Sequence, residues 1–279
     1  MSMLNVLMIG DVVGDPGLEA LEHLLPLMVK EKSVDFVTVN GENAAGGFGL
    51  TPSYLERILA AGADVVTSGN HIWEKREIWP VLNTEKRILR PLNYPAGSPG
   101  RGWVHLKKAS VKTGEAVSWF VVNLQGREFM TAIDCPFKTF DALTAELENP
   151  ELLKDEIPIE NPVILVDFHA ESSREKEALA YYIDGRASVV AGTHTHVQTA
   201  DERLLPNGSA YITDLGMTGV LGGVIGMDAK ICLDRALNQV LYRMEVAAPG
   251  ESGKTAVQGI IAEINGDTGK AVSIRRFSA

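Results

Sequence analysis

Apolar residues along this chain fall into short runs that end at glycine or polar residues. Such runs cover residues 5–9, 36–40 and 63–68, and helical spacing of apolar residues fills 18–30 and 53–61 between them. A short continuous apolar run bounded by turn residues is typical of a buried strand. Three successive strand–turn–helix units therefore predict parallel strands joined by right-handed crossovers.

The later part of the chain carries further strand and helix signals. Residues 103–111 and 117–124 are β-rich and flank Thr113-Gly114, which predicts a hairpin. Residues 242–274 alternate in a strand-like way, with a turn at 265–267. Since no segment has the composition of a linker, we expect a single domain over residues 1–279. The remaining predicted elements are strands at 162–166, 187–191 and 211–214 and helices at 141–147 and 173–182.

The composition is that of a globular protein, with 45% hydrophobic and 22% charged residues among 279. The formal net charge of -10 argues against stable binding of nucleic acid, whose phosphates require a basic surface. A small anionic substrate stays compatible with this charge if a metal centre supplies positive charge locally.

Cysteine content and hydropathy bear on the cellular compartment. Cys135 and Cys232 are too few and too far apart in the sequence for a disulfide scaffold or a cysteine-type zinc site, so a reducing compartment suits them. The first residues lack the features of a signal peptide, and no apolar run approaches the roughly 18 residues that span a bilayer. We expect a cytoplasmic protein that does not enter a membrane.

Two histidines, His194 and His196, follow the predicted strand at 187–191. Residues i and i+2 of an extended segment point the same way, so both imidazoles are able to face one point. Imidazole is the commonest side-chain metal ligand. Taken alone, the pair is equally compatible with two loop histidines that face solvent.

Potential metal ligands also follow four other predicted strands. If these strands are parallel neighbours, their carboxyl ends meet at one edge of a sheet. The donors are oxygen and imidazole without thiolate, which favours Mn, Fe, Zn or Co. They are too many for one ion, so two ions that share a carboxylate, as in enzymes that clamp a phosphoryl group, are the expected number. The additional candidates are Asp11, Glu42, Asn70, His71 and His169.

These motifs resemble the calcineurin-like metallophosphoesterases and, more narrowly, the bacterial YmdB-type branch, which hydrolyses phosphodiesters including 2′,3′-cyclic AMP. The similarity covers nearly the whole chain and implies an α/β fold, a four-layer αββα sandwich. The motifs that carry it are Gly10-Asp11, Gly41-Glu42-Asn43, Gly69-Asn70-His71, His169 and Gly192-Thr193-His194-Thr195-His196, and further matching stretches lie at 39–47, 90–95, 167–171 and 213–219.

The resemblance implies a first metal held by Asp11, Glu42 and His196, with Asn43 close by. The wider superfamily has a histidine where Val13 stands and an aspartate where Glu42 stands. Both departures fit the narrower branch, in which Asn43 is able to fill the vacant ligand position. The implied metals are two divalent ions, Fe or Mn, with Zn also open.

The second implied metal lies among Glu42, Asn70, His169 and His194, with Glu42 bridging the two ions. By the same resemblance His71 is not a ligand. It faces the substrate, where it stabilises the phosphoryl charge or protonates the leaving oxygen. The resemblance also implies a homo-oligomer.

The resulting hypothesis is a dinuclear phosphodiesterase for small phosphodiesters, in which a metal-activated hydroxide attacks phosphorus and His71 assists the leaving group. A phosphomonoesterase is the first alternative, because the same metal core serves both reactions. A regulatory metal-binding module that acts through a partner protein is the second, although it has no need of His71. Candidates for orienting the ligand imidazoles are Asp167, Glu171 and Asp214; the role of the glycine-rich run 216–226 stays open.

Overall fold

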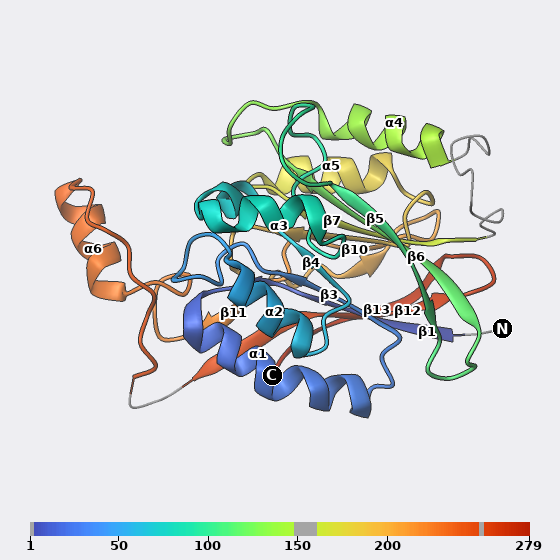
Figure 1. Cartoon of the computed structure of the whole chain (residues 1–279), viewed down its shortest axis with the longest axis horizontal. Coiled ribbons are helices and arrows are strands. Elements are labelled where there is room, and N and C mark those ends of the chain that lie inside the picture. Colours follow the sequence, from blue (N-terminus) through green and yellow to red (C-terminus); the bar gives the residue numbers. More distant parts are fainter. Residues whose placement is uncertain (1–2, 148–160, 251–253) are drawn as a thin grey trace.

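Two β-sheets pack face to face at the centre of the molecule, and helices cover the outer face of each (Figure 1). The computed structural model describes residues 3–147, 161–250 and 254–279. The first sheet has seven strands in the order β2-β11-β12-β1-β3-β4, with β13 paired to β12. These strands are β1 (Met3–Ile9), β2 (Asp11–Val12), β3 (Phe36–Asn40), β4 (Val65–Thr67), β11 (Met217–Val220), β12 (Thr255–Asn265) and β13 (Ala271–Ser278).

The second sheet has six strands in the order β5-β6-β7-β8-β10-β9. Its central strands β6, β7, β8 and β10 run parallel, whereas β5 and β9 pair antiparallel at the two edges. The strands are β5 (Trp103–Ala109), β6 (Ala116–Gln125), β7 (Val163–His169), β8 (Val189–Thr193), β9 (Arg203–Leu204) and β10 (Ala210–Ile212).

Helices form the two outer layers. Those that follow strands of the first sheet are α1 (Gly14–Glu31), α2 (Pro52–Ala60) and α3 (Trp79–Thr84), with the 3-10 helices η1 (Asn70–Trp73) and η2 (Arg76–Ile78) between them. The second sheet is covered by α4 (Pro136–Leu147) and α5 (Ser173–Tyr182), and α6 (Ala229–Asn238) stands away from the body at the left of Figure 1.

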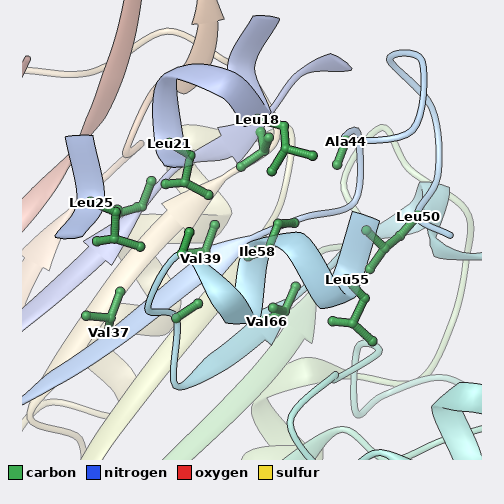
Figure 2. Packing of buried hydrophobic residues seen from close by; sticks show 14 of the residues in the cluster. Leu18, Leu21, Leu25, Val37, Val39, Ala44, Leu50, Leu55, Ile58 and Val66 are labelled. Carbon is green, nitrogen blue, oxygen red and sulfur yellow. The ribbon is translucent and has the colours of Figure 1, made fainter. Parts of the chain in front are cut away.

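Strands β1, β3, β4 and β12 of the first sheet each contribute to two different cores because successive side chains point to opposite faces. In β1, Leu7 and Ile9 face the α1–α2 layer, while Val6 and Met8 face the second sheet. Figure 2 shows the outer core, where leucines of α1 and residues of α2 pack over Val39 of β3. The apolar runs of the sequence are continuous because both faces of these strands are covered.

The inner core joins the two sheets. Phe36 of β3 stacks on Trp119 of β6, with ring centroids 4.7 Å apart and an interplanar angle of 15°. A third core lies between the second sheet and its helices, where Leu124 packs with Phe140 of α4 and Leu179 of α5. Three cores between four layers make the predicted αββα sandwich.

Most predicted elements are present, and β1, β3 and β4 are parallel as expected. The hairpin of β5 and β6 is also confirmed. The strand prediction at 242–274 is wrong over its first part: among its described residues before β12, only Val246 forms an isolated bridge, to Met227. The short helices η1, η2 and α3 and the projecting helix α6 were not predicted.

No residue of α6 is buried, so its helical form is not imposed by packing against the body. Asp228 caps its first turn by accepting a hydrogen bond from the backbone N–H of Ile231 at 2.8 Å. Among the helices that the structure describes, none has the length and apolar character needed to cross a membrane.

Candidate metal centre

The predicted ligands lie where strand ends from the two sheets meet. Asp11 and Glu42 follow β1 and β3 of the first sheet, whereas His169 ends β7 and His194 follows β8 of the second. The expectation that all five strand ends share one sheet edge is therefore wrong. The site is formed between two sheets, because the inner core brings their carboxyl ends together.

His169 is the centre of one group of these side chains. Its Nε2 lies 3.0 Å from Oε1 of Glu42, 3.0 Å from Oδ1 of Asn70 and 3.0 Å from Nδ1 of His194. Potential ligand atoms of Glu42, His169 and His194 all lie within 4.8 Å of one another. Four donor atoms with lone pairs thus converge on a small buried volume, and such a set fits a cation.

Thr193 and Asp167 set the orientation of His169 through hydrogen bonds on the side of the ring that faces away from Glu42. The Thr193 hydroxyl donates its single hydrogen to Oδ1 of Asp167 at 2.7 Å, so it accepts from Nδ1 of His169 at 3.0 Å. Asp167 is itself held by donors from Thr67 and Asn40. The proton on Nδ1 leaves the Nε2 lone pair of His169 directed at the group around Glu42.

His196 belongs to a second group with Asp11 and Asn43. Its Nε2 lies 3.4 Å from Oδ2 of Asp11 and 3.1 Å from Nδ2 of Asn43. Its Nδ1 donates to the backbone carbonyl of Ile225 at 2.9 Å, which again leaves the Nε2 lone pair facing the site. Oδ1 of Asp11 and Oδ1 of Asn43 are buried and accept no hydrogen bond from the described residues, so this group also fits a cation.

Glu42 lies between the two groups. Its Oε1 is 3.0 Å from His169 and accepts from Nδ2 of Asn43 at 3.2 Å. Its Oε2 accepts from the backbone N–H of His71 at 3.0 Å, and Asn40 accepts from its backbone N–H at 3.1 Å. Of the carboxylates in the site, Glu42 is therefore the one that contacts both groups of side chains.

His194 is oriented by Glu171. Nε2 of His194 lies 3.2 Å from Oε2 of Glu171, while its Nδ1 faces His169. The backbone is unusual here, because φ is +100° at His194 and +63° at His196, although neither residue is glycine. Between them, Thr195 donates from both its N–H and its hydroxyl to Asp214.

His71 occupies the rim of the site. Its side chain is 26% exposed, packs edge-on against Phe48 at 5.0 Å, and has Nδ1 3.5 Å from Oε1 of Glu74. Among the described residues, the hydrogen bond from His71 to a ligand candidate comes from its backbone N–H, which donates to Glu42. The ring of His71 is therefore partly exposed beside a buried polar cluster, where a substrate is able to reach it.

The electrostatics of the buried groups follow from their proximity. Burial opposes ionisation of Glu42, but the charge of His169 and its hydrogen bond lower the pKa of Glu42 to about 2. Burial likewise opposes charge on His169, and Glu42 outweighs it, so the pKa of His169 rises to about 9. Burial and the charge of His169 lower the pKa of His194 to about 3. The carboxylates thus attract positive charge into the site, whether a proton on His169 or a metal ion.

The structure adds residues that sequence reasoning missed. Thr193, Asn40 and Thr67 support His169 through Asp167, and Thr193 and Asn40 stand inside motifs already singled out. Lys176 is buried and donates to Asp214. Nothing in the sequence indicated this role, because a lysine on a helix usually faces solvent. Of the orienting candidates, Glu171 contacts an imidazole directly and Asp167 acts through Thr193, whereas Asp214 reaches the histidine loop through the backbone N–H and hydroxyl of Thr195.

Comparisons with known proteins agree with this architecture. A 2′,3′-cyclic-nucleotide 2′-phosphodiesterase of Bacillus subtilis is 42% identical over 274 residues, which are 98% of this chain and 96% of the relative. The crystal structure of a hypothetical protein from Thermus thermophilus has a TM-score of 0.83 and 38% identity and covers 99% of both chains. That of a phosphatase from Mycoplasma pneumoniae has a TM-score of 0.84 and 29% identity, over 100% of this chain and 94% of the other.

These likenesses confirm the predicted metallophosphoesterase fold. A model of the YmdB-like proteins matches residues 7–277, and the chain belongs to this family.

Proposed function

We propose that this protein is a metal-dependent phosphodiesterase that hydrolyses small phosphodiesters, with 2′,3′-cyclic nucleotides such as 2′,3′-cyclic AMP as the substrate class. One observation carries the proposal: His169 and His196 direct Nε2 at the carboxylates of Glu42 and Asp11, His194 directs Nδ1 at the same group beside His169, and the other nitrogen of each imidazole contacts a second polar group. The B. subtilis relative, a 2′,3′-cyclic-nucleotide 2′-phosphodiesterase, supports the same substrate class.

Two divalent cations fit the two groups of side chains. Asp11, Asn43 and His196 would hold one, and Asn70, His169 and His194 would hold the other, with Glu42 between them. Bound there, the cations supply positive charge to the phosphoryl oxygens and acidify an attacking water. Oxygen and imidazole donors without thiolate favour Mn, Fe, Zn or Co; on the family resemblance we propose Fe or Mn, with Zn also open.

The protein's own contribution is orientation and proton transfer. The hydrogen bonds that His169 and His196 donate to Thr193 and Ile225, and the contact of His194 with Glu171, fix the three ligand imidazoles before any substrate arrives. His71 stands at the rim with an exposed ring, where it would protonate the leaving oxygen or stabilise the phosphoryl charge.

The deciding experiment compares turnover of 2′,3′-cyclic AMP with that of a phosphomonoester by the Mn- or Fe-loaded protein, with a chelator control. Chelator-sensitive cleavage of the cyclic diester well above that of the monoester is the expected result. Faster monoester cleavage would favour a phosphomonoesterase, and bound metal without turnover of either ester would favour the regulatory module.

Variants sharpen this comparison. Glu42→Ala and His194→Ala should abolish turnover, because each removes a proposed ligand, and His71→Ala should lower turnover while metal stays bound. His23→Ala, on α1 away from the site, is the matched control. Full activity of Glu42→Ala or His194→Ala would reject the proposed site.

We further propose, on the family resemblance, a cytoplasmic homo-oligomer built from a single-domain chain. Light scattering coupled to size-exclusion chromatography tests the oligomer, and a mass equal to the 30.2 kDa of one chain would contradict it.

A further inference from the structure

A buried ion pair contacts the loop that follows β8 and carries His194 and His196. Lys176 of α5 is 1% exposed and Asp214 is fully buried, and Nζ of Lys176 donates to Oδ2 of Asp214 at 2.7 Å. The lysine stem passes Gly192 so closely that a Cβ there would lie 2.8 Å from Cδ of Lys176. Lysine is seldom fully buried, so its position in this molecule calls for a reason.

Asp214 uses the rest of its carboxylate to hold the loop. Oδ2 also accepts from the backbone N–H of Thr195 at 3.2 Å and from its hydroxyl at 2.9 Å. Oδ1 accepts from the backbone N–H of Gly216 at 2.9 Å. Thr195 is the residue between His194 and His196, so the ion pair of Lys176 and Asp214 is hydrogen-bonded to the centre of the loop that carries both imidazoles.

These hydrogen bonds matter because the backbone of the loop is strained. His194 and His196 both have positive φ values, which are unfavourable in a residue other than glycine. A free loop would relax toward ordinary φ values, and the two imidazoles would then rotate away from Glu42 and Asp11. The strain therefore persists only while the surroundings hold the loop, and they do so at Thr195 and at the His194 backbone N–H, which donates to Oδ2 of Asp11 at 3.0 Å.

Stability alone does not explain the ion pair. Removing two charges from water costs about as much as, or more than, their attraction returns, so buried ion pairs are often replaceable by uncharged residues without loss of stability. We propose that Lys176 and Asp214 are positioning residues, which hold Thr195 and thereby preset His194 and His196 for metal binding. This inference rests on the proposed metal site and deepens it.

The test measures Mn²⁺ affinity by isothermal titration calorimetry, together with the thermal unfolding of the metal-free protein. The double variant Lys176→Met/Asp214→Asn removes both charges at similar side-chain size, and an asparagine offers one acceptor oxygen in place of two. We expect the metal-free protein to stay folded and its Mn²⁺ affinity to fall by about 10- to 100-fold, the usual effect of losing support behind a ligand.

The control is Lys108→Met, which breaks the ion pair of Lys108 with Asp64 at 2.7 Å, outside the proposed site. It should leave Mn²⁺ affinity within about 2-fold. A folded double variant whose affinity equals that of the control would overturn the proposal. Since metal affinity is measured without substrate, a protein that binds metal but hydrolyses nothing would reject the proposed function and leave this inference standing.

A second pair of variants keeps the proposal testable if the double variant does not fold. Thr195→Val removes only the hydroxyl that donates to Asp214, whereas Thr195→Ser keeps it. Loss of one such hydrogen bond should weaken Mn²⁺ binding by about 2- to 10-fold in the valine variant and not in the serine variant. Equal Mn²⁺ affinities of the two variants would show that the hydrogen bond from Thr195 to Asp214 does not position the loop.

Discussion

The Nδ1 atom of His169 lies 3.0 Å from the Thr193 hydroxyl oxygen, although the two residues belong to different strands. Since that hydroxyl donates to Asp167, it accepts from His169 and fixes the tautomer whose Nε2 is free to bind a metal. One threonine thus determines which nitrogen of the most buried histidine faces the site.

Replacing Thr193 by valine should weaken metal binding, because the imidazole loses the acceptor that fixes its tautomer. We expect an affinity loss of about 10-fold or more, the lower end of the range for residues that support a metal ligand. Thr193→Ser keeps the hydroxyl and should bind Mn²⁺ nearly as the unchanged protein does. Calorimetric titration of both variants checks this, and equal affinities would show that the hydroxyl does not matter.

Metal should stabilise the fold. A ligand that binds only the folded protein adds about 2.7 kcal/mol at 100 times its dissociation constant. We expect Mn²⁺ to raise the Tm and a chelator to lower it, as measured by differential scanning calorimetry. Glu42→Gln should remove most of this difference, because Glu42 contacts both groups of proposed ligands. A Tm that is insensitive to the chelator would argue against bound metal.

Gly69→Ala should damage the site, because a Cβ at this position would lie 2.1 Å from Cδ2 of His169. The side chain of His169 is tightly held, so the η1 segment with Asn70 must move away from it. We expect weaker Mn²⁺ binding and a lower Tm. Gly222→Ala meets no atom within 4 Å and is the matched control; similar behaviour of both variants would contradict the packing argument.

The contact between α1 and α2 should make stability depend on pH. Glu22 accepts two hydrogen bonds from Arg57 at 2.8 Å, and these lower the pKa of Glu22 below its ordinary 4.5. A lowered pKa in the folded protein stabilises it above pH 4.5, and this contribution disappears as the pH falls through the folded-state pKa. Glu22→Gln should therefore cost about 0.2–1 kcal/mol at pH 7, the range for solvent-exposed pairs.

The same substitution should have almost no effect at a pH low enough to protonate Glu22 in the folded state. Urea denaturation at pH 7 and at low pH measures both values. Glu19→Gln, at an exposed position of the same helix, is the control. A cost of Glu22→Gln that does not change with pH would mean that packing, not charge, joins the two helices.

The sequence indicated most strands because their signal is local. The run Phe36–Asn40 contains Phe36, Val37 and Val39, and these apolar residues with the turn residues that follow are enough to identify a buried strand. Helix α6 was not predicted, although Leu233 and Leu237 lie one helical turn apart in its sequence; both stay exposed, and the helix buries no residue. Alternation of residue type at 242–250 gave a false strand, because no neighbouring strand in the described part of the chain pairs along that segment.

The sequence alone thus determined which polar residues follow the strands, from Asp11 to His196, because residue type and strand end are both local properties. Only the tertiary structure decided how these residues meet. It divided them between two sheets, chose the free nitrogen of His169 through Thr193, and buried Lys176 against Asp214. The physical reason is distance along the chain: the contact of Asn40 with Asp167 joins residues 127 positions apart, and only packing of the whole chain brings them together.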